Sequence, residues 1–409
     1  KRFIDSYKVV QLLLDNKETL LKELERTDDI LSTQYYHKCE ESDSLEFNES
    51  NLKMNEYKPK KQEKFINVFL DFETNTTGDC HTPYLAKVYQ EKVNFKGEES
   101  GKKLLDHMCR KYKYQNLKLI AHNAKYDLTF IFKYLKNINL IGRGTMLLRA
   151  WAVYYCDGKR VLIQVQDSYA MIAMKLKKFQ ETFDLEADKE LLPYDMYNDE
   201  NINKKWLTPL ECKVFCETQC QKENIGVDVD EEMVNKYFGE FMANCDKWDC
   251  IDGDGRVNII KYSAMYCQMD TRVLAEGYEK FKQWMSEITD GLNIDDYVSL
   301  PSLADDYLRK EGYYDGVYAV GGIVRAFLQK CVVGGRCMTR ENKTWHVLGL
   351  SADLDATSLY PSAQNELGGY LMGKPKVLTT TDYEVLETYD GYFVQIRITK
   401  VNKHRKFPL

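Results

Sequence analysis

Two carboxylates, Asp71 and Glu73, stand one residue apart at the end of the apolar run "NVFLDFET" (67–74). The run is typical of a buried strand, on which residues i and i+2 point to the same side. Two like charges at one spot repel each other unless a cation lies between them. The pair therefore indicates a metal site, although acidic residues are also common at ordinary strand ends and turns.

Two further segments have carboxylates that could complete such a site. In "AHNAKYDLTF" (121–130), Asp127 stands near the start of a helix that follows an apolar strand. In "YSAMYCQMDTRVL" (262–274), Tyr266 and Asp270 are four apart and share one helix face. Taken singly, each has an ordinary interpretation, an acid favoured by a helix N-terminus or a solvated surface pair. The order of these segments in the sequence, after Asp71 and Glu73, favours one shared site.

A second acidic motif lies in "ADLDATSLYPSAQ" (352–364), where the apolar segment "HVLGLSADL" (346–354) leads to Asp355. The S-L-Y-P string after it predicts a turn into a helix. An ordinary strand-to-helix turn with Ser358 as N-cap is the alternative interpretation.

The elements that must position these residues follow from hydrophobic periodicity. Strands are predicted at 65–70, 116–121, 160–168, 346–355 and 391–401. Helices are predicted at 1–36, 125–138, 174–185 and over most of 208–288, with a turn at 249–258. Strands and helices alternate from Phe65 onward, which predicts an α/β fold.

Composition narrows the class of protein. The 409 residues suffice for two or three domains, and the net charge of −6 argues against a non-specific DNA coat. No apolar stretch is long enough to predict a membrane span. Twelve cysteines without a secretory signal indicate reduced thiols in an intracellular compartment. The spacing of Cys212, Cys216 and Cys220 favours one face of a helix over a zinc site.

Together, the three carboxylate segments resemble the Exo I, Exo II and Exo III motifs of the Tyr-containing DEDD-type 3′–5′ exonucleases. The resemblance implies an RNase H-like domain with a mixed sheet flanked by helices. It implies two divalent ions per site, Mg²⁺ or Mn²⁺, held by four carboxylates: Asp71, Glu73, Asp127 and Asp270. In the two-metal mechanism that follows, Tyr266 orients the attacking water and Asn123 contacts the DNA end.

The string D-x-x-S-L-Y-P resembles motif A of family-B DNA polymerases. By that resemblance Asp355 binds the catalytic metals, and the backbone after it cradles the triphosphate of a dNTP at Ser358, Leu359 and Tyr360. Tyr360 would also stack under the incoming sugar.

Three weaker motifs resemble those of the protein-primed branch of the family. "QKCVVGGRCMTREN" (329–342) resembles its YxGG motif, with Gly334 and Gly335 near DNA and Val332 where the Tyr is expected. "DSYAMI" (167–172) resembles the single-strand-binding motif, with Ser168 kept and Tyr169 in place of Leu. "KELL" (189–192) makes Lys189 a candidate at the scissile phosphate, with a plain surface lysine as the alternative.

The resemblance implies a domain order and a set of partners. An N-terminal helical segment and linker (1–62) of unknown function precede an exonuclease domain (63–288), a connecting segment (289–345) and a partial palm (346–409). Implied partners are a single-stranded 3′ end, primer-template DNA, a dNTP and a terminal protein. The replicon would decide whether the compartment is the cytoplasm, the nucleus or an organelle.

The chain begins without Met, and motifs B and C of the family do not follow motif A before it stops at "KHRKFPL". We therefore expect a fragment that degrades DNA but does not polymerise. Two alternatives stay open. One is a stand-alone DEDD-type exonuclease or RNase. The other is a non-catalytic module that holds single strands or a terminal protein through the basic runs 175–178 and 403–406.

Overall fold

The computed structural model describes residues 52–60, 64–75, 80–187, 190–226, 228–332, 343–352, 355–376, 378, 382–396 and 399–400. The chain divides into two compact units. The larger unit comprises residues 57–311, and the smaller comprises residues 1–56 with 312–409. The helix predicted at 1–36 lies outside the described residues.

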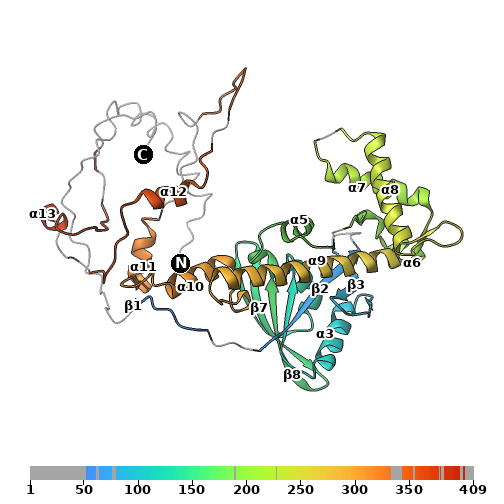
Figure 1. Cartoon of the computed structure of the whole chain (residues 1–409), viewed down its shortest axis with the longest axis horizontal. Helices are drawn as coiled ribbons and strands as arrows, with labels where there is room; N and C mark the ends of the chain where they lie inside the picture. Colours follow the sequence, from blue (N-terminus) through green and yellow to red (C-terminus); the bar gives the residue numbers. More distant parts are fainter. Residues whose placement is uncertain are drawn as a thin grey trace, which may run out of the picture. The chain divides into compact units, whose positions relative to one another are not determined.

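A seven-stranded mixed sheet forms the centre of the larger unit, in the order β4-β3-β2-β5-β8-β7-β6 (Figure 1). Its strands are β2 (Ile66–Asn75), β3 (Thr82–Val88), β4 (Phe95–Lys96), β5 (Leu117–Ala121), β6 (Lys136–Arg143), β7 (Met146–Cys156) and β8 (Lys159–Asp167). The central strands β2, β5 and β8 are parallel, and the other neighbours are antiparallel. The predicted α/β class, with a mixed sheet flanked by helices, is confirmed.

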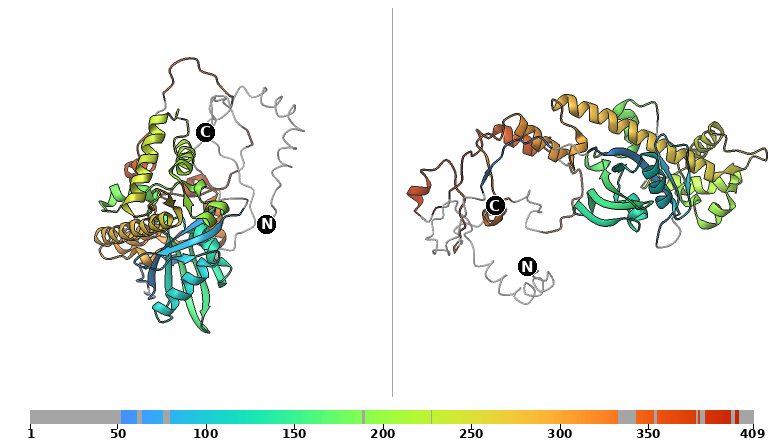
Figure 2. Two further views of the ribbon diagram at one scale, coloured as in Figure 1. Left: turned by 90° about the vertical axis from the view of Figure 1, so that its right-hand side faces the viewer. Right: turned by 90° about the horizontal axis from the view of Figure 1, so that it is seen from below.

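Helices cover both faces of this sheet. On one face, α3 (Ser100–Lys111) and α4 (Lys125–Phe132) bury the side chains of Val68, Leu70 and Phe72 from β2. On the other face, α5 (Phe179–Phe183) and the long α9 (Ile259–Ile288) bury Phe69, and Figure 2 shows α9 along the sheet from two further sides. Because side chains alternate along a strand, Asp71 and Glu73 share the α9 side with Phe69.

Shorter elements complete the larger unit. They are η2 (Ser168–Ala170), η3 (Leu176–Lys178), η4 (Tyr194–Met196), α6 (Asp199–Lys204), β9 (Trp206–Leu207), α7 (Pro209–Glu223), α8 (Glu231–Lys247), β10 (Val257–Asn258), η5 (Ile294–Asp296) and α10 (Leu300–Lys310). Helices α7 and α8 pack together, and their core holds Cys212, Cys216 and Cys220 beside Cys245. Burial raises the pKa of Cys212 and Cys216 to about 12, as expected for neutral core thiols.

Two predicted helices differ from the observed elements. The helix predicted at 125–138 ends at Phe132, and the chain enters β6 at Lys136. Pairing with β7 decides this boundary, since β-structure depends on neighbours more than on local sequence. The helix predicted at 174–185 is only the single turn η3 followed by α5.

In the smaller unit, neither of the strands predicted at 346–355 and 391–401 is formed within the described residues. The elements there are β1 (Lys53–Met54), β11 (Tyr318–Ala319), α11 (Gly322–Gln329), α12 (Leu359–Glu366) and α13 (Tyr383–Leu386). A strand needs a neighbour to satisfy its backbone groups, and the described residues of this unit pair only β1 with β11 and make one isolated bridge. Leu348 and Leu350 are accordingly fully exposed.

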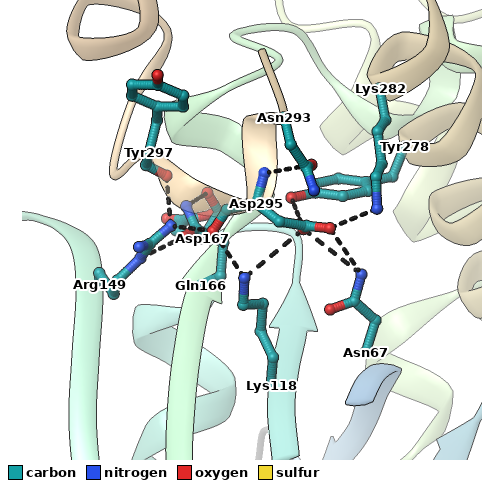
Figure 3. Close-up of polar contacts among 10 residues, drawn as sticks. All are labelled: Asn67, Lys118, Arg149, Gln166, Asp167, Tyr278, Lys282, Asn293, Asp295 and Tyr297. Carbon is teal, nitrogen blue, oxygen red and sulfur yellow. Dashed lines mark hydrogen bonds and ion pairs between the residues drawn. The ribbon is translucent and has the colours of Figure 1, made fainter. Parts of the chain in front are cut away.

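A buried polar network ties η5 to the sheet and to α9 (Figure 3). The carboxylate of Asp295 accepts hydrogen bonds from Asn67, Tyr278 and Lys282, and its Oδ1 lies 3.7 Å from Lys118 Nζ. Arg149 adds a bond from its guanidinium to the Asp295 carbonyl at 3.2 Å. Three strands and one helix thus hold η5 in place.

Residues after α9 therefore belong to the larger unit. Leu292, Ile294, Tyr297 and Leu303 are buried in the core formed by α5 and α9. The compact unit accordingly runs to residue 311, whereas the predicted exonuclease domain ends at 288. The assignment of activities to these ranges stays a prediction. No helix among the described residues is both long and apolar enough to cross a membrane.

Gly277 lies where α9 packs against the phenylalanine side chains of α5. A Cβ at this position would lie 2.5 Å from Cδ2 of Phe179 and 3.1 Å from Cδ2 of Phe183. We expect Gly277→Ala to lower the free energy of unfolding, measured in urea, by about 1–3 kcal/mol because of overpacking. The control is Gly239→Ala on the exposed face of α8, where a Cβ meets nothing within 4 Å. That variant should be up to about 1 kcal/mol more stable. Equal shifts in both variants would contradict the packing argument.

Candidate metal centre

The two carboxylates of β2, Asp71 and Glu73, lie on the side of the strand that faces α9. Glu73 is buried and Asp71 is half-buried. One carboxylate oxygen from each lies within 4.8 Å of the other and of the Cys267 Sγ on α9. The Cys267 thiol donates to Asp71 Oδ2 at 3.6 Å and to the Asp71 carbonyl at 3.5 Å. The end of β2 and the middle of α9 therefore share one small polar space.

Asp127 reaches the same space from α4. The helix follows β5, and β5 runs parallel to β2, so the carboxyl ends of the two strands meet at one edge of the sheet. The Asp127 carboxylate accepts a hydrogen bond from the backbone N–H of Phe72, between Asp71 and Glu73. Burial, and then the charge of Asp71, raises the pKa of Asp127 well above its usual range. Asp127 Oδ1 is buried and has no hydrogen-bond partner among the described residues.

Helix α9 adds the remaining predicted residues. Asp270 and Tyr266 are both buried, at 5% and 2% exposure. Burial raises the pKa of Tyr266, and the charges of Asp270 and Glu73 add to the effect. Burial likewise raises the pKa of the Cys267 thiol, with further contributions from Asp71, Glu73 and Asp270. Asp71, Glu73 and Asp270 thus all act on the Cys267 thiol of α9, whereas Asp127 is linked to this cluster through Asp71.

The four carboxylates fit a divalent cation. Burial and the charge of Asp71 both disfavour the ionised form of Asp127, and a cation beside the two carboxylates would relieve both effects. The unsatisfied Asp127 Oδ1 is the specific observation, because a buried acceptor without a donor is costly unless an ion or a water meets it. Carboxylate oxygens are the donors that Mg²⁺ and Mn²⁺ prefer.

The loop between β5 and α4 is held by Asp167, at the end of β8. The Asp167 carboxylate accepts hydrogen bonds from the N–H groups of Asn123 and Tyr169, at 2.9 and 3.0 Å. Asn123 has a φ of +66°, in the left-handed region that Asn tolerates. Ser168 is fully buried, and its hydroxyl bonds to His122 Nδ1 and to the Ala121 carbonyl. The predicted DNA contacts of Asn123 and Ser168 stay predictions, and a contact by Ser168 would have to break these bonds.

Other predicted site residues lie apart from this cluster. Lys189, Gly334 and Gly335 lie outside the described residues, and Val332 next to them is exposed. In the smaller unit, Ser358 is the N-cap of α12, with φ +49° and no side-chain capping bond. Leu359 and Tyr360 are exposed, at 59% and 67%. Among the described residues, the one group of three or more clustered metal-ligand atoms comprises Asp71, Glu73 and Cys267 and includes none of Asp127, Asp270 and Asp355.

Three residues at the centre were not singled out from the sequence. Cys267 is three residues before Asp270 on α9, and this i, i+3 spacing would have revealed a shared helix face. Asp167 ends a parallel strand beside β5, which is the same signal that marked Asp71. The hydroxyls of Tyr194 and Tyr266 share a 3.2 Å hydrogen bond in which either can be the donor. No local sequence pattern predicts that contact.

Comparison with known proteins shows what the chain is similar to. Residues 108–409 match the profile of a family described as "DNA polymerase type B, organellar and viral". A DNA polymerase of Kluyveromyces lactis is 22% identical over 350 residues, covering 81% of this chain. The chain spans about a third of the length of that relative, because the match covers 32% of it.

Solved structures give a more distant likeness. Phi29 DNA polymerase in complex with primer-template DNA and incoming nucleotides matches with a TM-score of 0.39 and 13% identity. That match covers 67% of this chain and 40% of the other. The complex of the same polymerase with single-stranded DNA has a TM-score of 0.24 and 16% identity, over 46% of this chain and 32% of the other.

Proposed function

The chain belongs to the organellar and viral type B DNA polymerases, and on that premise we propose that its larger unit is a metal-dependent 3′–5′ exonuclease that proofreads DNA. The observation that carries the proposal is the cluster of Asp71 and Glu73 on β2, with Asp127 of α4 close enough to Asp71, and Asp270 of α9 close enough to Cys267, for their charges to act there. Asp71 and Glu73 precede the matched residues 108–409, so their place beside Asp127 is independent support.

Asp71, Glu73, Asp127 and Asp270 would hold two divalent ions, Mg²⁺ or Mn²⁺. Such ions supply the Lewis-acid activation that phosphodiester hydrolysis needs. The chain's own residues then orient the reactants. The Tyr266 hydroxyl, which bonds to the Tyr194 hydroxyl at 3.2 Å, would hydrogen-bond to the attacking water and direct it. The burial of Glu73, Asp127 and Asp270 lowers the local dielectric and would strengthen these polar contacts.

Aromatic side chains near the centre suit a single-stranded 3′ end. Tyr126 precedes Asp127 and is 37% exposed, and its hydroxyl bonds to Thr74 and His81 at 2.7 and 2.6 Å. Tyr169 is equally exposed beside the Asn123 loop. Bases stack on such rings without sequence preference, as a proofreading site requires. Lys189 would assist at the scissile phosphate.

The polymerase activity of the whole protein is part of the same proposal. Asp355 would bind catalytic metal, and the backbone from Ser358 to Tyr360 would hold the triphosphate of a dNTP. Gly334 and Gly335 would approach primer-template DNA. A terminal protein would supply the primer, as in the protein-primed branch, and the reactions would take place inside a cell.

The test is degradation of a 5′-labelled single-stranded DNA by this chain in Mg²⁺. We expect a ladder that shortens from the 3′ end, that EDTA abolishes, and that Asp71→Ala reduces more than about 100-fold, the upper range for loss of a supporting ligand. Asp246→Ala, on the exposed face of α8, is the control and should cleave normally. A labelled RNA in parallel distinguishes a ribonuclease from a DNA exonuclease.

Two results would contradict the proposal. Cleavage that survives Asp71→Ala would show that the carboxylate pair is structural. Retained binding of single strands with no metal-dependent cleavage would favour the non-catalytic binding module.

A further inference from the structure

Building on the proposed exonuclease centre, we propose that Cys267 is a sulfur ligand in it and that the site binds a thiophilic divalent ion, Zn²⁺ or Cd²⁺, in competition with Mg²⁺. A thiolate is a softer donor than a carboxylate and adds a preference for such ions that an all-carboxylate site lacks. The thiol changes the chemical class of cation that the centre accepts.

The distances fit an ion of this class. Zinc binds sulfur at about 2.3 Å and carboxylate oxygen at about 2.0–2.2 Å, so two such ligands at a tetrahedral angle lie about 3.6 Å apart. Cys267 Sγ lies 3.6 Å from Asp71 Oδ2. Glu73 is within the same 4.8 Å group. An ion can therefore take the place of the thiol proton, which leaves to the buffer, with little movement of either ligand.

Asp127 is an independent indication of a ligand here. Its side chain is 5% exposed, and its Oδ1 has no hydrogen-bond partner among the described residues. Its carboxylate is held by the Phe72 N–H, between the two acidic residues of β2. Asp127 is not in the 4.8 Å group, so Cys267, Asp71 and Glu73 are the proposed ligands, and the unsatisfied Asp127 Oδ1 is a buried acceptor beside Asp71 that a bound ion or its water could satisfy.

The position of Cys267 in α9 holds the thiol beside the carboxylates of the centre. It lies in the interior of a continuous 30-residue helix, beside Tyr266 and one turn before Asp270. Its exposure is 0%. Since the side chain is fully enclosed and already contacts Asp71, close packing leaves the sulfur little room to turn away from an entering metal. A thiophilic ion at low concentration would then displace one Mg²⁺ and inhibit cleavage.

The experiment is a Cd²⁺ titration of the full chain, followed by the ultraviolet charge-transfer band of thiolate-bound Cd²⁺. Four cysteines are first replaced by Ser so that they contribute no band: the exposed Cys80 and Cys331, and Cys39 and Cys337, which lie outside the described residues. We expect one tight site whose band disappears in Cys267→Ala, with Zn²⁺ affinity, measured by calorimetry against Mg²⁺, reduced at least about 10-fold. Cys109→Ala, in the apolar core under α3, is the matched control and should keep the band.

A second variant covers the case in which Cys267→Ala fails to fold. Asp127→Asn leaves the thiol in place and should weaken Cd²⁺ binding at least about 10-fold. A band that survives Cys267→Ala, or Cd²⁺ affinity unchanged in Asp127→Asn, would overturn the inference.

The outcomes separate this inference from the proposed function. Loss of the band in Cys267→Ala, in a chain that never degrades DNA in Mg²⁺, supports the sulfur ligand and counts against the exonuclease. Mg²⁺-dependent degradation with a Cd²⁺ band independent of Cys267 supports the exonuclease and overturns the sulfur ligand.

Discussion

Asp127→Asn is expected to slow Mg²⁺-dependent degradation of a 3′ end by more than about 100-fold while making the metal-free protein more stable, by about 0.5–2 kcal/mol. Both effects have one cause. Asp127 is buried beside Asp71, and burial and that neighbour raise its pKa. An amide of the same shape removes the repulsion but also removes a ligand. Urea unfolding with and without Mg²⁺ measures the stability change.

The metal dependence of stability gives the control. An ion that binds only the folded state stabilises the wild type in proportion to the logarithm of its concentration. This Mg²⁺-dependent gain should shrink in Asp127→Asn and persist in Asp246→Asn, which changes an exposed carboxylate of α8. A less stable Asp127→Asn protein that keeps the full Mg²⁺ effect would show that Asp127 is a structural acid.

Asp295→Ala is expected to lower the free energy of unfolding of the larger unit by about 3–5 kcal/mol, because it leaves buried cationic groups without their anion. Lys118 is 5% exposed at its side chain and lies 3.7 Å from Asp295 Oδ1, and Lys282 donates to the same carboxylate. Burial lowers the pKa of Lys118 to about 8 even with Asp295 present. Urea unfolding followed by far-ultraviolet circular dichroism measures the loss.

The adjacent Asp296 is the matched control. Burial raises its pKa, so the folded state disfavours its charge. Asp296→Ala should therefore be neutral or stabilising. Similar losses in both variants would mean that η5 tolerates no substitution and that the network itself is not the cause.

The contribution of Asp295 to the free energy of unfolding should also depend on pH. Burial alone would raise the pKa of Asp295, but the ammonium groups of Lys118 and Lys282 outweigh it and lower the pKa. A carboxyl with a depressed folded-state pKa stabilises the fold above its unfolded pKa of about 3.9, and the benefit is lost as pH falls through the folded-state value. The stability gap between wild type and Asp295→Asn should thus be constant near neutral pH and narrow below about pH 4. A gap that does not change with acid would contradict the ionic role.

Much of the centre was predictable because its signals are local. The strand alternation of "NVFLDFET" correctly placed Asp71 and Glu73 on one side of β2, and helical spacing correctly placed Tyr266 and Asp270 on one face of α9. The cysteines of α7 were likewise placed on a buried helix face. Each of these inferences needs only the side-chain periodicity of one strand or helix, and that periodicity can be seen in consecutive residues.

Other features depend on what packs against an element. Phe132 ends α4 because β7 offers a partner to the residues that follow. The strands predicted at 346–355 and 391–401 are missing in the described residues because no neighbouring strand satisfies their backbone there. The Asp295 network joins residues up to 228 positions apart, and no short sequence motif predicts such a long-range contact.

The sequence by itself thus determined which carboxylates are available and which side of its own strand or helix each one occupies. Only the tertiary structure decided that Asp127 reaches the Phe72 N–H beside Asp71, that Cys267 lies against Asp71, and that Tyr194 meets Tyr266. The physical reason is that periodicity fixes direction within an element, whereas distance between elements comes from the packing of α4 and α9 on the two faces of the sheet.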